Sequence, residues 1–377
     1  MENLHPKRIK YLHLFNGSNY ATINSFVKMI NKNFDPKDHF FVIRDTDENP
    51  KQEVSKYRNV AWLPHAEGIE YSVFLNYLHA AQHIFWHAVG WNFRTLFRVM
   101  LHPSLMKKSV WVEWGADLYN WRREQKGLRH RIVNSINEKW RRKVKAAVVI
   151  FPTDEEVFVK QFGDEIPILY AAYVAFPCDK TELLRPEEKK DGPLSILLGH
   201  SATPNCNHLK MLDKLAAYKD EDVLINIPIS YGDKDYAEET VKKARSIFPE
   251  EKLNIMRDPM PLADYISFLW TVDIGVFDVY RQIALGNIEQ LLYMRKKVFL
   301  PKESVLGRFY AENDCECFDV DKIGEMSFEK FAENKTNKEV PECIIKHLSE
   351  KSIIAEWKVV FAAAAAIKDK EASKNAR

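Results

Sequence analysis

Long apolar runs are absent from this chain of 377 residues, and the residues that interrupt regular structure are few. The roughly 18–20 uncharged apolar residues that a helix needs to span a bilayer never occur together. The first seven residues contain no apolar core of the kind found in signal peptides. Glycine (13) and proline (17) are scarce, while 46% of the residues are hydrophobic, which excludes a disordered chain. We therefore expect a globular protein that is soluble or at most peripheral to a membrane.

Cysteines are also few, and their spacing is unsuited to cross-linking or metal binding. The five cysteines are an odd number, no pair has zinc-finger spacing, and Cys315-Glu316-Cys317 has no partner pair downstream. Free thiols in a reducing cytoplasm are therefore expected. Two common nucleotide-binding patterns are missing as well, because the chain contains neither Gly-x-Gly-x-x-Gly nor a glycine loop ending in Gly-Lys-Ser/Thr.

Short apolar segments alternate with longer helical patterns along the chain, which is typical of parallel sheets covered by helices on both faces. The expected strands cover residues 9–15, 39–43, 83–89, 109–113, 147–151, 195–198, 223–229, 253–256, 273–277 and 298–300. The expected helices cover residues 25–33, 71–82, 91–100, about 120–145, a stretch from 154, 208–218, 236–247, 262–270 and 288–295. The sequence therefore predicts an α/β protein with doubly wound sheets.

A change of composition divides the chain into two expected domains. Residues 178–193 are polar, charged and proline-bearing, as an interdomain linker would be. We expect a first domain at 1–177, a second at 194–351, and a helix with a frayed tail at 352–377. Two such domains would place the carboxyl ends of their strands, where open α/β sheets bind ligands, on a shared cleft.

The most distinctive stretch of the first domain runs from Trp111 to Tyr119 and combines two acids, three aromatic residues and a glycine at a strand end. Glu113 and Asp117 are candidate acids or bases there, although Asp117 is equally suited to capping a helix. Asn16 and Gly17 end another strand, where a small polar loop lets a ligand approach the backbone or simply makes a turn.

The segment that follows is strongly basic. Between residues 122 and 145, ten Lys/Arg stand against two Glu, a net charge of +8 in a chain whose total is +2. Ile132, Ile136, Trp140 and Val144 recur every four residues and predict an apolar stripe packed on the sheet. The Lys/Arg face is either merely solvated or docks on anionic lipid, and the scarcity of acids favours docking. Nucleic acid is not expected, because no binding motif accompanies the charge.

The basic residues assigned to the membrane surface are Arg122, Arg123, Arg129, Arg131, Lys139, Arg141, Arg142 and Lys143.

In the second domain, three loops join a strand to a helix and suit an anionic ligand. The first, Gly199 to His208, places small residues before a helix, where free N–H groups and the helix dipole favour phosphate. It contains the candidates Gly199, Ser201, Asn207 and His208, with Asn207 alternatively a plain helix cap. The other loops supply Tyr231 with Gly232, and Gly286 with Asn287 and Glu289. Tyr231 could stack on a base and Glu289 could reach a ribose, whereas ordinary loop packing and capping are the alternatives.

No metal site is expected. Asp45-Thr46-Asp47 has the Asp-x-Asp form that holds a divalent metal on a nucleotide diphosphate. It lies in a charged surface loop, however, in the half of the chain that lacks the phosphate-type loops.

Taken together, these segments make the chain resemble the bacterial TDP-N-acetylfucosamine:lipid II N-acetylfucosaminyltransferases, a 4-alpha-L-fucosyltransferase family. The resemblance covers most of the chain from about Tyr11. Its anchors are residues 114–119, 196–199 with Ser201, Asn207-His208, 228–232 and 285–287. It implies a GT-B fold of two Rossmann-like domains, with the donor nucleotide bound mainly by the second, the acceptor mainly by the first, and no bound metal or other cofactor.

The resemblance also assigns roles and partners. The donor would be a nucleotide-diphosphate sugar, such as TDP-N-acetylfucosamine, and the acceptor a polyprenyl-diphosphate-linked saccharide of a surface polysaccharide. Such an acceptor would explain a basic helix on a protein peripheral to the inner face of the bacterial plasma membrane. In an inverting reaction one general base suffices, and the candidates are Asp117, then Glu113 and His87. Asn16, Gly17, Trp114 and Tyr119 would bind the acceptor.

Three residues depart from the family pattern. His200 and Cys206 stand where asparagine is typical, and Glu113 stands where relatives are usually apolar. Two other classes remain open from the residues alone: a non-catalytic membrane scaffold, and another sugar-nucleotide enzyme such as an epimerase on a doubly wound fold.

Overall fold

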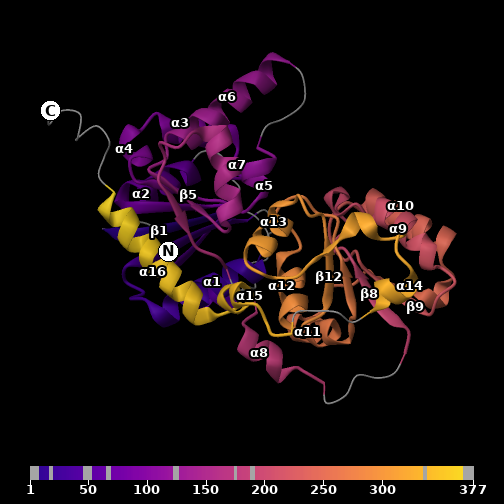
Figure 1. Cartoon of the computed structure of the whole chain (residues 1–377). Helices are drawn as coiled ribbons and strands as arrows, with labels where there is room; N and C mark the ends of the chain where they lie inside the picture. Colours follow the sequence, from indigo (N-terminus) through magenta and orange to yellow (C-terminus); the bar gives the residue numbers. More distant parts are fainter. Residues whose placement is uncertain are drawn as a thin grey trace. The chain divides into compact units, whose positions relative to one another are not determined.

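The computed structural model describes residues 8–16, 20–45, 53–64, 69–121, 127–173, 176–186, 192–333 and 338–367. Its contacts divide the chain into two compact units, one of residues 1–175 with 350–377 and one of residues 176–349. Each unit contains one sheet covered by helices (Figure 1). The prediction of an α/β protein is confirmed, since the strands of both sheets pair in parallel.

Seven strands form the sheet of the first unit in the order β3-β2-β1-β4-β5-β6-β7. They are β1 (Ile9–Asn16), β2 (His39–Asp45), β3 (Val60–Pro64), β4 (Ala81–His87), β5 (Ser109–Val112), β6 (Ala146–Val149) and β7 (Ile168–Tyr170). The chain builds outward from β1 to β3, then returns beside β1 with β4 and continues to the opposite edge. The carboxyl ends of β1 and β4 therefore flank the switch point at which such sheets bind ligands.

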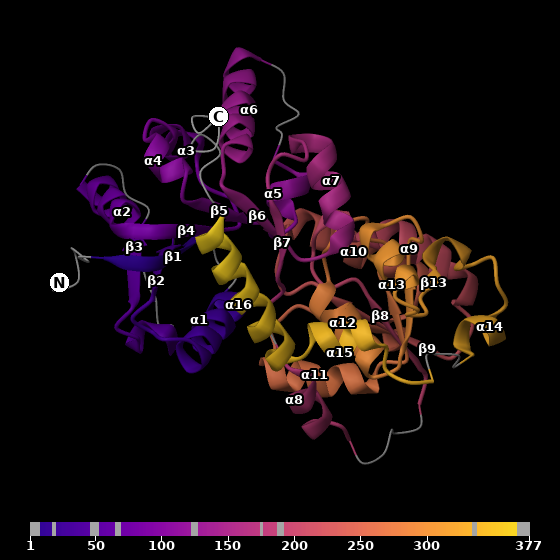
Figure 2. The ribbon, with the colours of Figure 1, turned by 60° about the vertical axis from the view of Figure 1, so that its left-hand side comes forward.

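Helices cover both faces of this sheet. Apolar residues of α1 and α16 pack on one face, and those of α2, α3, α6 and α7 pack on the other (Figure 2). The helices are α1 (Tyr20–Asn33), α2 (Ile69–Ala80), α3 (Phe93–Met100), α4 (Pro103–Met106), α5 (Ala116–Tyr119), α6 (Leu128–Arg142), α7 (Pro152–Phe162) and α16 (Glu350–Ala366), with a 3-10 turn η1 (Glu53–Lys56). Burial on both faces explains why the central strands read as apolar runs.

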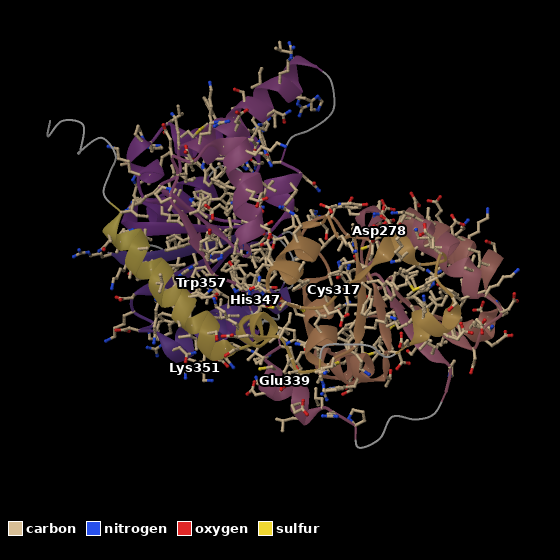
Figure 3. The ribbon with its side chains drawn as sticks, in the orientation of Figure 1. Asp278, Cys317, Glu339, His347, Lys351 and Trp357 are labelled. Atoms are coloured by element: carbon tan, nitrogen blue, oxygen red, sulfur yellow. The ribbon has the colours of Figure 1, made fainter. Side chains whose placement is uncertain are left out.

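The C-terminal helix α16 is an integral part of the first unit. Trp357 is fully buried and its indole Nε1 donates to the carbonyl of Ala172 at 3.0 Å. Glu356 accepts a hydrogen bond from the backbone N–H of the same residue at 3.1 Å. The chain thus returns to its first unit after completing the second, and Figure 3 marks Trp357 on this helix.

The basic helix α6 buries a different stripe from the one expected. Trp140 and Val144 are buried, but Ile132 is 49% exposed and Val133 is buried instead. A strict four-residue spacing turns by about 40° more than one full turn at each step, so its first and last members cannot share a face. The predicted stripe is therefore confirmed for Ile136, Trp140 and Val144, which pack on the sheet, and wrong for Ile132.

The second unit repeats the architecture with six strands in the order β10-β9-β8-β11-β12-β13. The strands are β8 (Leu194–Leu198), β9 (Val223–Pro228), β10 (Leu253–Met256), β11 (Ile274–Val276), β12 (Lys297–Leu300) and β13 (Phe318–Asp319). The switch point of this sheet lies between β8 and β11. Its longer helices are α9 (His208–Leu215), α10 (Lys234–Ile247), α11 (Leu262–Thr271), α12 (Leu285–Tyr293) and α13 (Val305–Glu312).

Shorter elements complete this unit: α8 (Cys178–Leu183), η2 (Pro204–Cys206), η3 (Ala216–Tyr218), η4 (Glu250–Lys252), η5 (Val320–Lys322), α14 (Phe328–Ala332) and α15 (Glu342–His347). Helix α8 lies within the segment expected to be a linker. Thr181 on α8 hydrogen-bonds Gln290 of α12 at 2.7 Å, and its carbonyl accepts from Trp270 Nε1 at 3.1 Å. This helix is therefore anchored on the second unit.

Candidate active site

The first candidate site is the carboxyl edge of the first sheet. Asn16, the last residue of β1, donates from its side-chain Nδ2 to the carbonyl of Gly90 at 3.0 Å. This bond joins the loops after β1 and β4 across the switch point. Asn16 therefore has a structural partner in the place where it was predicted to bind an acceptor, and Gly17 lies outside the described residues.

Asp117 is the hub of this edge. One carboxylate oxygen accepts from the backbone N–H of Val89 at 2.7 Å and from Trp111 Nε1 at 2.6 Å. The other accepts from the backbone N–H of Trp114 at 2.8 Å. The carboxylate is 7% exposed, so three donors hold it in a buried position and tie the loop after β4 to the loop after β5. Hydrogen bonds from the backbone to a carboxylate are strong and order the two loops that donate them.

Glu113 is fully buried at the end of β5 and also accepts from the backbone. Its Oε2 accepts from Gly115 N–H at 2.7 Å, and its Oε1 accepts from Ile150 N–H at 3.3 Å. Gly115 itself has a positive φ of 80°, which permits the sharp turn that aims this N–H at the carboxylate. The acid that departs from the family pattern therefore shapes the turn between β5 and α5.

His87, the remaining candidate base, ends β4 and is also fully buried. Its Nε2 lies 3.0 Å from His13 Nδ1, and its Nδ1 hydrogen-bonds the Tyr173 hydroxyl. Burial holds the pKa of His87 well below the ordinary histidine value. Tyr173, a half-buried residue that no sequence motif singled out, therefore lies between His87 and the surface in the described part of this edge.

The two aromatic residues predicted to bind an acceptor occupy different environments. Trp114 is half-buried, with its ring centroid 5.5 Å from that of Tyr173 and 6.0 Å from that of Phe15. Tyr119 donates its hydroxyl to Asp154 Oδ1 at 2.6 Å. Burial raises the pKa of Asp154 to about 6, against the lowering effect of this bond. Trp114 therefore lines the edge, whereas Tyr119 is engaged in an internal contact.

Not all of the basic residues face the surface. Arg141 is 1% exposed, donates to the carbonyls of Asp117 and Val89, and lies 5.0 Å over the Trp111 ring. Its assignment to a membrane surface was wrong, because it supports the Asp117 turn from below. Arg142 donates to the carbonyls of residues 161 and 162 and to Glu138.

Five of the assigned basic residues are exposed: Arg129, Arg131, Lys139, Arg142 and Lys143. Arg122 and Arg123 lie outside the described residues. Within the part of the chain that the structure describes, no helix is long and apolar enough to cross a bilayer.

The second candidate site is the carboxyl edge of the second sheet, beginning with the loop after β8. Gly199 has a φ of 69°, and a Cβ there would lie 2.3 Å from the His208 imidazole, so the glycine lets α9 begin close to the strand. Burial lowers the pKa of His208 to about 4, which keeps the ring neutral near pH 7. Ser201 is fully buried and bonds Thr203 Oγ1 at 2.9 Å and His200 Nε2 at 3.2 Å. These contacts build the loop itself.

The loop after β9 crosses the first one. Ala202 N–H donates to the Tyr231 carbonyl at 2.8 Å, and Asp233 N–H donates to the Ala202 carbonyl at 2.7 Å. A Cβ at Gly232 would lie 2.4 Å from that carbonyl oxygen, so glycine is required there by the crossing and not by a ligand. Tyr231 is 61% exposed beside His200 and remains available for stacking.

The loop after β11 supplies the buried carboxylate of an ion pair with a half-exposed lysine, which sequence reasoning missed. Asp278, two residues beyond β11, has a fully buried side chain 2.9 Å from Lys210 Nζ (Figure 3). Its carbonyl accepts from Asn207 Nδ2 at 2.8 Å, so Asn207 joins the loops after β8 and β11 and does not cap α9 with its side chain. Arg281 in the same loop acts on the charge of His200, whose pKa burial lowers to about 4.

The start of α12 is the most open part of this edge. A Cβ at Gly286 would meet nothing within 4 Å. Asn287 donates to the Tyr265 hydroxyl at 2.9 Å. Glu289, in contrast, is 5% exposed and its Oε1 lies 2.7 Å from His347 Nδ1. Glu289 therefore holds α15 against α12, and its contacts do not favour the predicted ribose role.

The described part of the chain contains no cluster of three or more His, Cys, Asp or Glu side chains able to hold a metal ion. Thr46 and Asp47 of the Asp-x-Asp segment lie outside the described residues.

Solved glycosyltransferases share this architecture over nearly the whole chain. HepE from Anabaena, in complex with UDP and glucose, superposes with a TM-score of 0.68 at 10% identity, covering 94% of this chain and 99% of that one. A glycosyltransferase from Rickettsia africae ESF-5 gives 0.65 at 12% identity, covering 96% and 100%. Sucrose-phosphate synthase from Thermosynechococcus elongatus gives 0.65 at 8% identity, covering 96% and 100%. With the two parallel sheets, these similarities define a GT-B fold.

A family model narrows the class. Residues 17–364 match the 4-alpha-L-fucosyltransferases, glycosyl transferase group 56, and the chain therefore belongs to that family. The protein is a glycosyltransferase, which sets aside a non-catalytic scaffold and an epimerase as alternatives.

The contacts of Asp117 generate a stability prediction. In Asp117→Asn, the new side-chain NH2 replaces one of the two oxygens that now accept from N–H groups. At least one buried N–H donor then loses its acceptor. We expect the free energy of unfolding to fall by about 1–3 kcal/mol. Chemical denaturation followed by tryptophan fluorescence measures the change.

Asp233→Asn is the matched control. Asp233 caps α10 by accepting from Tyr236 N–H at 2.9 Å, and asparagine caps about as well. We expect its stability to stay within about 0.5 kcal/mol of the unmodified chain. An Asp117→Asn variant as stable as the Asp233→Asn control would contradict the hub role.

Proposed function

We propose that this enzyme transfers an amino-deoxy sugar, such as N-acetylfucosamine, from a TDP-linked donor to a polyprenyl-diphosphate-linked glycan in bacterial surface polysaccharide synthesis. Membership of the 4-alpha-L-fucosyltransferase family is the observation that carries this proposal. The UDP and glucose bound to HepE support a nucleotide-diphosphate sugar as donor. The stereochemical course proposed is inversion, with one proton acceptor in the first unit.

The donor is assigned to the carboxyl edge of the second sheet. Parallel α/β sheets bind nucleotides at the switch point, here between β8 and β11. A departing diphosphate needs positive potential, and the N-terminus of α12 with Arg281 supplies it. Gly286 leaves open space at that N-terminus, and Tyr231 is exposed for stacking on a base.

Helices α3 and α6 support docking on an anionic membrane. They pack side by side and expose large apolar side chains: Phe97 (46%) on α3, Leu101 (63%) at its C-cap, and Leu128 (73%) and Ile132 (49%) on α6. Exposed apolar side chains flanked by Arg and Lys suit the boundary between lipid headgroups and acyl chains. We propose that this surface holds the first unit at the inner face of the plasma membrane, where a lipid-linked acceptor is presented.

A transfer assay tests the function directly. The full chain is incubated with membrane-extracted lipid-linked acceptors and a set of nucleotide sugars, and products are identified by mass. We expect a mass increase of one N-acetyl-amino-deoxyhexose with the TDP donor. Transfer of another sugar would revise the donor, and no transfer with any pair would overturn the function proposed.

Filling the space at Gly286 tests the donor site. TDP should stabilise the unmodified protein by about 2.7 kcal/mol at a hundredfold excess over its Kd. We expect Gly286→Val to keep its unliganded melting temperature, because nothing lies near the new side chain, yet to lose most of the shift with TDP. Thermal denaturation with and without nucleotide measures both.

Gly192→Val is the control, since a Cβ there also meets nothing within 4 Å and Gly192 lies before β8, at the opposite end of the strand. It should retain the full shift with TDP. If Gly286→Val also retained it, α12 would not form the diphosphate site.

Charge reversal on α6 tests membrane docking. Basic residues near an anionic surface contribute about 1 kcal/mol each, so Arg129→Glu with Arg131→Glu should weaken binding to phosphatidylglycerol-containing vesicles by at least about 30-fold. Co-sedimentation measures the loss. The matched control is Lys234→Glu with Lys242→Glu, two exposed residues of α10. Equal weakening in both variants would mean that net charge, and not this surface, governs binding.

A further inference from the structure

Three histidines and a tyrosine form one continuous hydrogen-bonded chain in the first unit. His39 Nδ1 lies 3.0 Å from His13 Nε2, and His13 Nδ1 lies 3.0 Å from His87 Nε2. His87 Nδ1 then hydrogen-bonds the Tyr173 hydroxyl. These four residues, here called the imidazole chain, join the interior of the sheet to its carboxyl edge.

The register of the sheet produces this alignment. The three histidines lie on the adjacent strands β2, β1 and β4. His39 pairs with Tyr11, two residues before His13, and His87 pairs with Phe15, two residues after it. Side chains two residues apart point to the same face. The three histidines of the imidazole chain therefore lie on one face of the sheet. From His39 to His13 to His87, each lies closer to the carboxyl edge, where β4 ends.

The imidazole chain is buried among aromatic side chains. His13 and His87 are fully buried and His39 is 3% exposed. Aromatic rings from α1 and α16 cover them, with Phe26 5.4 Å from the His13 ring and Phe361 4.8 Å from the His39 ring. Burial lowers the pKa of His39 to about 4 and holds that of His13 well below the ordinary histidine value, so the imidazoles are neutral near pH 7.

Among the described residues, the charged groups that act on the imidazole chain do so at its two ends, His39 and Tyr173. Asp38, Asp35 and Lys10 act on His39. Glu113 and Asp117 act on Tyr173. The interior of the chain thus offers a path for a proton with no fixed charge to trap it, and each end communicates with polar surroundings.

Neutral imidazoles impose an order on the protons. A neutral ring carries one N–H, so each contact in the chain holds one proton and all rings must point their N–H groups the same way. In one order, the Tyr173 hydroxyl donates to His87 and leaves its oxygen free to accept. In the other, His87 donates to Tyr173, whose hydroxyl proton then points outward. Passing one proton along the chain converts the first order into the second.

We propose that Tyr173 accepts the proton lost by the attacking hydroxyl of the acceptor and that the imidazole chain carries a proton away. This inference rests on the transferase function proposed above. The carboxylates of Asp117 and Glu113 accept backbone N–H bonds, which leaves Tyr173, half-buried against Trp114, as the group that presents a proton acceptor at this edge. Tyr173 is the catalytic residue in this scheme, and the histidines act through it.

The step balances in protons and electrons. The acceptor O–H bond breaks as its oxygen bonds to the sugar carbon, and that proton joins the Tyr173 oxygen. The original Tyr173 proton moves to His87 Nδ1, the His87 Nε2 proton to His13 Nδ1, and the His13 Nε2 proton to His39 Nδ1. The proton on His39 Nε2 leaves toward Asp38 and Asp35, the carboxylates whose charges act on His39. Burial raises the pKa of Tyr173 well above 10, so this phenol accepts a proton only by handing on its own.

Tyr173→Phe is the test, because phenylalanine keeps the ring contacts with Trp114 and Trp357 and removes only the hydroxyl. We expect kcat to fall by about 10²–10⁴-fold, the range of general acid–base catalysis, with the KM for both substrates within about threefold. Single-turnover transfer in D2O should be slowed for the unmodified enzyme and insensitive for the variant. A merely structural role would leave the isotope effect unchanged.

Two further variants sharpen the result. His39→Gln keeps a polar group opposite His13 but cannot pass on a proton, so it should lower kcat by about tenfold or more with KM unchanged. Tyr11→Phe is the matched control on the same face, where the hydroxyl lies 3.5 Å from the Phe361 carbonyl. It should retain kcat and the isotope effect. Unmodified kcat in Tyr173→Phe would overturn the proposal.

A measurement independent of turnover separates this inference from the function it rests on. Nitrogen-15 spectra of histidine-labelled protein, assigned by single His→Gln variants, should show His13, His39 and His87 as neutral imidazoles with exchange-protected N–H protons, and Tyr173→Phe should shift the signal of His87. Imidazoles that titrate near pH 6.5 would overturn the chain, whatever the transfer assay gives. Absence of transfer with intact spectra would instead count against the proposed function and the catalytic role built on it.

Discussion

Parallel pairing of every described strand is the constraint on which the rest of this molecule depends. Because the strands of a sheet run the same way, their carboxyl ends lie at one edge. Every loop that leads from a strand to the next helix therefore begins at that edge. Residues as distant in sequence as Asn16, His87 and Asp117 come together in the first unit for this reason. The second unit uses the same device to join the loops after β8, β9 and β11.

The two acids at the carboxyl edge of the first sheet are held by hydrogen bonds from the backbone. Asp117 and Glu113 sit where a general base is expected, yet backbone N–H groups hold both of them, and Arg141 supports the turn from below. Buried carboxylates with this many donors fix the backbone, because leaving any of those donors unpaired in the interior is costly. In the proposed mechanism the proton-accepting role therefore passes from these two carboxylates to Tyr173.

The second edge is built on the opposite electrostatic principle. Its polar side chains hydrogen-bond within a loop or between loops, as Ser201 does with Thr203 and Asn207 with the backbone carbonyl of Asp278. What remains turned outward is the start of α12 at Gly286 and the exposed ring of Tyr231. A helix N-terminus needs no metal to attract a diphosphate, since its N–H groups and dipole already favour negative charge.

The sequence by itself determined the class of fold, the order of most strands and helices, and the loops that form each edge, because hydrophobic period and small polar residues at strand ends are local signals. Short strands such as β7 and β13 escaped it, since two or three residues carry no period. It also misplaced Arg141 at a surface and gave no sign of the contact between Glu289 and His347, because the partners of both residues come from other elements. Only the tertiary structure decided which polar groups are consumed by packing, and only the register of β2, β1 and β4 could align His39, His13 and His87 with Tyr173. Side-chain pairing across a sheet depends on contacts distant in the chain, and no local pattern encodes them.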